Sequence, residues 1–153
     1  MTEDLAPIAG HERAQALLDR PRTLGVLATN GVDGAPHQVQ LWYLVFDDHL
    51  VVNGRAGRTW PANLLRDPTF SFLVGAGGEW VSLSGRGEEV EDRAQGQRDI
   101  AMMAAKYLEP EVAERSVRGF VQEERASFRL MPTRIVVHPD DTLRKKRMLA
   151  RQG

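Results

Sequence analysis

Two arginines and a threonine lie close together in the first half of the chain, in the segment NGRAGRTWPANLLRDP. Arg55 and Arg58 carry guanidinium groups, whose planar forks match the oxygens of a phosphate. Thr59 adds a hydroxyl. Pro61 is typical of the first turn of a helix, where unpaired N–H groups and the helix dipole also favour an anion. The segment therefore indicates a phosphate-binding turn, and the alternative is a solvated, charged loop.

No other group of residues in the sequence has the spacing of a metal site or a nucleophile motif. The four histidines are scattered along the chain, at His11, His37, His49 and His138. The sequence contains no G-x-S-x-G motif and no glycine-rich phosphate loop of the P-loop or Rossmann type. It also lacks cysteine, which excludes a disulfide framework, a thiolate metal site and a cysteine nucleophile. Because no histidine has a partner at ligand spacing, we expect no metal. We also expect no nucleic-acid partner, since the formal net charge is only -1.

The length and hydropathy pattern favour one compact domain. At 153 residues the chain is long enough to bury a hydrophobic core, and we treat residues 1–153 as a single domain. No apolar run is long enough to cross a bilayer. The first residues are acidic and lack the apolar core of a signal peptide, so we expect a cytoplasmic protein without a membrane partner.

Short strands and tight turns surround the arginine segment. We expect six strands, over residues 23–30, 37–46, 50–54, 69–75, 80–91 and 126–138, the last interrupted at Pro132 and Thr133. Phe70, Phe72 and Val74 alternate with polar residues, as in a half-buried strand. Short connections favour antiparallel hairpins over parallel crossovers. The pattern predicts a small antiparallel β-barrel decorated by helices.

Helical periodicity and end signals predict four helices around these strands. They cover residues 11–21 (within an N-terminal helical region of 1–22), about 61–68, 92–108 and 110–122. Asp92 is the expected N-cap of the third helix. The basic residues 140–153 are expected to form an exposed tail.

Four motifs occur in the order found in one protein family. They are TLGVLATNGVDGAPHQVQLWYLV, NGRAGRTWPANLLRDPTFSFLV, EWVSLSGRGEEVED and LMPTRIVV. They resemble, in turn, the opening hairpin, the Arg-rich turn with its short helix, a later strand and the closing strand of the pyridoxamine 5'-phosphate oxidase-like split β-barrels. The resemblance extends from about Leu24 to Val137 and implies a six-stranded antiparallel FMN-binding split barrel.

Within this superfamily, the short chain and the helical insert after WVSLSGRG look most like the type B flavin/deazaflavin oxidoreductases, near the deazaflavin-dependent biliverdin reductases. This resemblance implies a homodimer with one cofactor in each of two clefts at the subunit interface. It also implies hydride transfer from reduced coenzyme F420 to a small unsaturated organic substrate. The protein would orient the reactants, so no catalytic side chain is expected. Two alternatives are an FMN-dependent oxidoreductase and a non-catalytic barrel that binds a flavin or tetrapyrrole.

The resemblance also implies roles for individual residues in cofactor binding. Arg58 falls at the family's phosphate-binding arginine, with Thr59 beside it and Asn63 on the helix that backs the pocket. Gln38 and Gln40 lie on the strand that passes the cofactor ring in relatives, or are simply outward-facing polar residues.

Two tryptophans complete the candidate site. Trp80 lies on the strand expected to border the cleft, and the alternative for it is a core or interface aromatic. Trp60 stands where relatives usually carry a lysine, so a cation is missing from the phosphate site. Arg55 could compensate for that missing charge. Trp60 itself could stack on a cofactor ring or fill the pocket.

Overall fold

The computed structural model describes residues 4–153, with the side chains of residues 141–144 excepted. The helices are α1 (Glu12–Leu18), α2 (Thr59–Arg66), α3 (Arg93–Tyr107), α4 (Pro110–Phe120) and α5 (Asp141–Ala150). The strands are β1 (Gly25–Asn30), β2 (Pro36–Leu41), β3 (Leu44–Val45), β4 (Leu50–Arg55), β5 (Thr69–Ala76), β6 (Glu79–Val90) and β7 (Arg125–His138).

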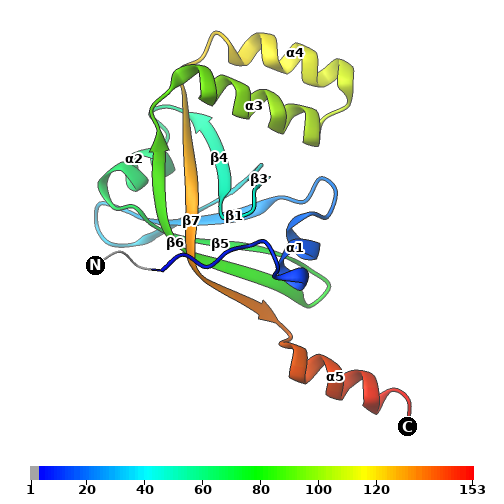
Figure 1. The fold of residues 1–153 in the computed structure, drawn as a ribbon. Coiled ribbons are helices and arrows are strands. Elements are labelled where there is room, and N and C mark those ends of the chain that lie inside the picture. Colours follow the sequence, from blue (N-terminus) through cyan, green and yellow to red (C-terminus); the bar gives the residue numbers. More distant parts are fainter. Residues whose placement is uncertain (1–3) are drawn as a thin grey trace.

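The described strands form one antiparallel sheet in the order β2-β1-β5-β6-β7-β4-β3. The sheet curls into a half-open barrel, with the α3–α4 hairpin across one end and α5 extending away from the body (Figure 1). The predicted antiparallel barrel with helices is therefore confirmed. No helix among residues 4–153 is long and apolar enough to cross a bilayer.

The sheet has seven strands, so the prediction of six was wrong. The expected strand over 37–46 divides into β2 and β3 because the backbone of Tyr43 leaves the sheet ladder. Its N–H donates to the Tyr107 hydroxyl (3.3 Å), and its carbonyl accepts a hydrogen bond from Lys106 Nζ (2.9 Å). Side chains of α3 thus replace the strand partners that this peptide group would otherwise need.

The last strand, β7, is assigned without a break from Arg125 to His138, but its ladder with β6 is irregular at the predicted interruption. Ser84 pairs with Arg134 and Gly85 pairs with Pro132, so Thr133 is left without a register partner on β6. This irregularity accommodates Pro132, which has no N–H to donate. Gly85 is needed there because a Cβ at that position would overlap the carbonyl oxygen of Met131.

The core lies inside the curled sheet, where alternate side chains of each strand point inward. Phe70, Phe72 and Val74 of β5 are buried, as the alternation predicted, and Val81 and Leu83 of β6 continue the same layer. Helix α1 closes this core, and its Leu18 carbonyl accepts a hydrogen bond from the Tyr43 hydroxyl (2.6 Å).

Helices α3 and α4 begin close to the predicted positions, whereas α5 lies in the segment that was predicted only as an exposed tail. Asp92 caps α3 by accepting a hydrogen bond from the Ala94 N–H (3.0 Å), as predicted. Within the expected N-terminal helical region, helix covers only Glu12–Leu18, and residues 1–3 lie outside the described residues. Residues 145–153 are exposed, and α5 runs to Ala150; the side chains of 141–144 lie outside the described part of the chain.

Candidate functional site

The arginine segment forms a turn between β4 and α2. Strand β4 ends at Arg55, and Gly57 takes a left-handed backbone conformation (φ +88°) that favours glycine. The Ala56 N–H donates to the Glu124 carbonyl (2.8 Å), which ties the turn to the start of β7. Helix α2 then begins at Thr59, and no side chain caps it. The predicted helix after the two arginines is confirmed, and it begins at Thr59, two residues before the expected start at Pro61.

A cavity of about 460 Å³ opens beside this turn, and we call it the arginine cavity. Its wall includes three guanidinium groups and one carboxylate, from Arg55, Arg58, Arg125 and Glu123. Three positive charges and one negative charge leave an excess of positive charge in the cavity. Its apolar wall comes from β2, the turn after it and the α3–α4 hairpin, through Leu41, Trp42, Ile100 and Phe120. The cavity thus combines an anion-binding end with an apolar wall.

Sequence analysis missed Arg125, whose side chain is fixed by several contacts. It faces Arg55 across the β4–β7 ladder, and its side chain is only 10% exposed. Its Nε donates to Asn53 Oδ1 (2.9 Å), and its Nη1 donates to Glu123 Oε2 (2.5 Å). The guanidinium lies 4.7 Å from the centre of the Phe120 ring, within range of a cation–π interaction. Its Nη2 donates no hydrogen bond to another of the described residues.

Trp60 forms part of the core while also lining the arginine cavity. Its side chain is 3% exposed and packs at 5.7 Å from Phe128, ring centre to ring centre. It also contacts Gly54, where an added Cβ would be 2.8 Å from Trp60 Cζ2. The indole therefore packs against the neighbouring strands β4 and β7. Its burial favours the pocket-filling alternative over cofactor stacking.

Of the other predicted residues near the turn, Asn63 has a structural position. It is buried, its Nδ2 donates to Thr29 Oγ1 (3.0 Å), and its Oδ1 accepts a hydrogen bond from Arg66 (3.0 Å). The bond to Thr29 joins α2 to β1, and the bond from Arg66 lies within α2. Thr59 and Gln38 are exposed and fall outside the linings of the arginine cavity and of the second cavity described next.

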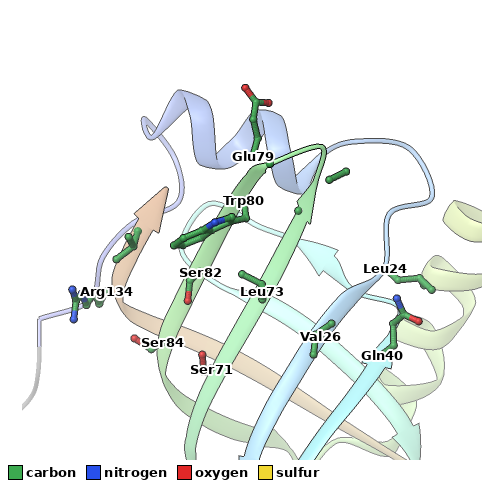
Figure 2. A pocket seen from close by; sticks show the side chains of 14 residues that line it. Leu24, Val26, Gln40, Ser71, Leu73, Glu79, Trp80, Ser82, Ser84 and Arg134 are labelled. Atoms are coloured by element: carbon green, nitrogen blue, oxygen red, sulfur yellow. The ribbon is translucent and has the colours of Figure 1, made fainter. Parts of the chain in front are cut away.

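A second cavity of about 760 Å³ lies on the outer face of the sheet, and we call it the sheet cavity. Figure 2 shows its side chains standing on one face of β1, β2, β5, β6 and β7. The floor is apolar, with Val26, Leu73 and Val136, and is interrupted by the hydroxyls of Ser71 and Ser82. A mainly apolar surface of this kind can pack against a planar conjugated ring.

Gln40 and Leu24 line both cavities and so mark the place where they meet. Trp80 stands at the far side of the sheet cavity, stacked on His138 with ring centres 5.2 Å apart and planes 13° apart. The structure therefore brings Arg55, Arg58 and Gln40 together at the arginine cavity. Trp80 lies in the sheet cavity, which continues from it at Gln40.

Aromatic packing against α3 supports the wall of the arginine cavity. Trp42 stacks on Tyr107, with ring centres 5.3 Å apart and planes 6° apart. Lys106 Nζ lies 4.3 Å from the centre of the Tyr43 ring, and burial lowers the pKa of this lysine. Burial likewise raises the pKa of the Tyr107 hydroxyl, which donates to the Thr23 carbonyl (2.7 Å). Through these contacts, α3 fixes the segment between β2 and β3.

No group of three or more potential metal ligands occurs among the described residues. The site is instead a cleft lined by arginines on an antiparallel split barrel. Split barrels of this kind form a class of cofactor-binding folds. The chain belongs to the pyridoxamine 5'-phosphate oxidase family, whose sequence profile matches residues 11–138. The family binds flavin or deazaflavin cofactors; most of its members are oxidoreductases, and some are not catalytic.

Comparison with solved structures gives the same fold. A conserved hypothetical protein, Rv2991 from Mycobacterium tuberculosis, is 26% identical with a TM-score of 0.69, over 90% of this chain and 88% of that one. A structure named F420 reductase is 20% identical (TM-score 0.63, 80% and 94% covered). The heme storage protein HutZ from Vibrio cholerae is 17% identical (TM-score 0.66, 85% and 95% covered). Comparison with curated protein sequences finds no significant match.

Proposed function

We propose that this protein is an oxidoreductase that binds coenzyme F420 and reduces a small unsaturated organic substrate. The observation that carries the proposal is the junction, at Gln40, of an arginine-lined cavity and a larger apolar one. A cofactor of the family has a charged phosphate and a planar tricyclic ring. The two cavities offer a matching environment for each part, so the residues present fit the group.

Each part of the cleft has a role in this proposal. Arg55 and Arg58 bind the phosphate through charge-assisted hydrogen bonds. Gln40 is placed to hydrogen-bond the edge of the ring, and the apolar floor of the sheet cavity excludes water from the reacting face. When bound, the reduced cofactor supplies hydride chemistry, and the chain supplies orientation and a dry surface.

The choice of F420 over FMN rests on the resemblance to type B proteins and on the helical insert. In the structure this insert is the α3–α4 hairpin, and it contributes Ile100 and Phe120 to the arginine cavity. FMN remains the alternative, because it presents a phosphate and a tricyclic ring of the same shape.

We also propose that the functional unit is a homodimer. Leu73 on the outer face of the sheet is 43% exposed, and with Leu24, Val26 and Val136 it lines the mainly apolar floor of the sheet cavity. A second copy packed near this face would shield the floor from water. It would also place each cofactor cleft at the boundary between subunits.

A second candidate function is binding without turnover. Trp60 favours it, because this buried ring occupies the position of the family's usual lysine and removes one cation from the phosphate site. Carriage or sensing of a flavin or tetrapyrrole would tolerate that loss better than catalysis.

Two measurements on the purified protein separate these functions. Fluorescence titration with F420 and with FMN identifies the cofactor by affinity. Turnover of the reduced cofactor is then followed with quinones, enones, nitroaromatics and biliverdin. Binding with turnover supports the oxidoreductase, and tight binding without turnover of any of these substrates supports the second function. Failure of both cofactors to bind would refute the proposal.

A further inference from the structure

Glu123 lies between the two arginines that face each other across the β4–β7 ladder. Its Oε1 is 3.3 Å from Arg55 Nε, and its Oε2 accepts a hydrogen bond from Arg125 Nη1 (2.5 Å). One carboxylate thus uses both oxygens to join two guanidinium groups. This is the arrangement that two oxygens of a bound phosphate would adopt between the same arginines.

The two arginines need an anion between them. Arg55 and Arg125 are direct register partners on neighbouring strands, and like charges in such a pair destabilise a sheet. Glu123 relieves this repulsion in the protein without a ligand. Any other anion at that position would relieve it equally.

The three side chains differ in how freely they can move. Arg125 is fixed by Asn53, whose Nδ2 in turn donates to the Gly96 carbonyl (3.0 Å), and by the Phe120 ring. Glu123 follows α4 in the connection to β7, and its side chain is 24% exposed. The carboxylate can therefore swing toward solvent while Arg125 stays in place.

We propose that Glu123 is an internal counter-anion that occupies the phosphate position in the protein without a ligand and is displaced by the phosphate of the cofactor. Arg125 is then the buried anchor of that phosphate, and it supplies the cation that Trp60 removes. The inference rests on the proposed function because it concerns the same cleft, and it adds two residues and a competition to that function.

The competition predicts an unusual pair of effects for Glu123→Gln. Loss of the carboxylate leaves Arg55 and Arg125 unneutralised, so the protein without ligand should unfold at a lower temperature. The same change frees the anion site, so the cofactor should bind on the order of tenfold more tightly. A glutamate with a purely structural role would instead give equal or weaker binding when it is removed.

Glu124→Gln is the matched control. Glu124 is the next residue, is 64% exposed and pairs with Arg93 at 2.5 Å, but it does not line the arginine cavity. It should leave the affinity unchanged. Arg125→Lys is the second variant, which keeps the charge but loses the guanidinium fork. It should weaken binding of the cofactor about tenfold and leave binding of the same chromophore without its phosphate unchanged.

The experiment measures dissociation constants of the wild type and the three variants by fluorescence, for FMN with riboflavin and for F420 with its phosphate-free chromophore. Unfolding temperatures with and without inorganic phosphate are measured in parallel. Tighter binding by Glu123→Gln, confined to the phosphate-bearing ligands, supports the inference. Equal or weaker binding by a variant that still unfolds cooperatively overturns it and leaves the proposed function intact.

The phosphate measurement decides the case in which neither cofactor binds the wild type. That result would refute the proposed function. The anion competition would still be supported if inorganic phosphate raised the unfolding temperature of Glu123→Gln more than that of the wild type. An equal response of the two proteins would overturn it.

Discussion

Replacing Trp60 tests whether this residue is a core side chain or a ligand contact. The indole is 3% exposed and packs between Phe128 and Gly54. Trp60→Ala removes a buried aromatic ring next to a strand that cannot easily collapse. Such truncations cost about 3–5 kcal/mol of folding free energy. We expect a loss in this range, measured by urea unfolding with linear extrapolation.

Gly54 provides an internal control for this account. In the wild type, Gly54→Ala would place its Cβ 2.8 Å from Trp60 Cζ2, and the nearest atoms to that Cβ all belong to Trp60. Overpacking of this kind costs about 1–3 kcal/mol. In the Trp60→Ala background this obstacle is gone, so Gly54→Ala should cost nothing or stabilise.

The double-mutant cycle therefore predicts a coupling of about 1–3 kcal/mol between the two sites. A loss below about 1 kcal/mol for Trp60→Ala, together with additive effects in the cycle, would refute the core assignment. Trp60 would then have to be considered as a residue of the open cleft.

Three further predictions concern the frame around the site. Hydrogen bonds from Asn30 and from Thr69 lower the pKa of Asp67 in the folded protein. The ionised carboxylate therefore stabilises the fold fully at a pH above the ordinary carboxyl pKa. This stabilisation is lost as the pH falls through the lowered pKa of the folded state. Asp67→Asn should therefore shrink the drop in unfolding temperature between pH 7 and pH 3; an unchanged drop would contradict this. Gly85→Ala should lower the free energy of unfolding by about 3 kcal/mol or prevent folding, as measured by soluble yield and thermal unfolding. A variant with nearly the unfolding temperature of the wild type would show that the backbone at the β6–β7 irregularity can move to accept the added Cβ. If the proposed homodimer forms through the outer face of the sheet, Leu73→Lys should give a monomer in sedimentation, whereas the wild type and Leu65→Lys, an exposed control on α2, should be dimers.

Local pattern predicted the parts of the fold that depend on neighbouring residues in the chain. The alternation of Phe70, Phe72 and Val74 gave the buried face of β5 correctly, because side chains on a half-buried strand repeat every two residues. The break at Tyr43 could not be predicted in this way. It depends on hydrogen bonds to Lys106 and Tyr107, more than sixty residues further along the chain.

The same distinction applies to the site. Arg55 and Arg58 were found because they are close together in the sequence and precede a helix. Arg125 was missed because only the register of β4 with β7 brings it opposite Arg55. Trp60 is buried where Gly54, which has no side chain, leaves room for the indole. No local sequence pattern shows this contact. The signal available in the sequence was the charged cluster EER directly before the last predicted strand.

The most direct test of the central claim is the affinity of Arg58→Ala for F420 and FMN, beside the wild type and Arg115→Ala. Arg115 is an exposed arginine on α4 outside both cavities, so it controls for the loss of one surface charge. Arg58 should donate charge-assisted hydrogen bonds to the phosphate, and its loss should weaken binding of the preferred cofactor by roughly 10- to 100-fold. Arg115→Ala should bind like the wild type. Equal affinities of all three proteins would contradict the assignment of the arginine turn as the phosphate site.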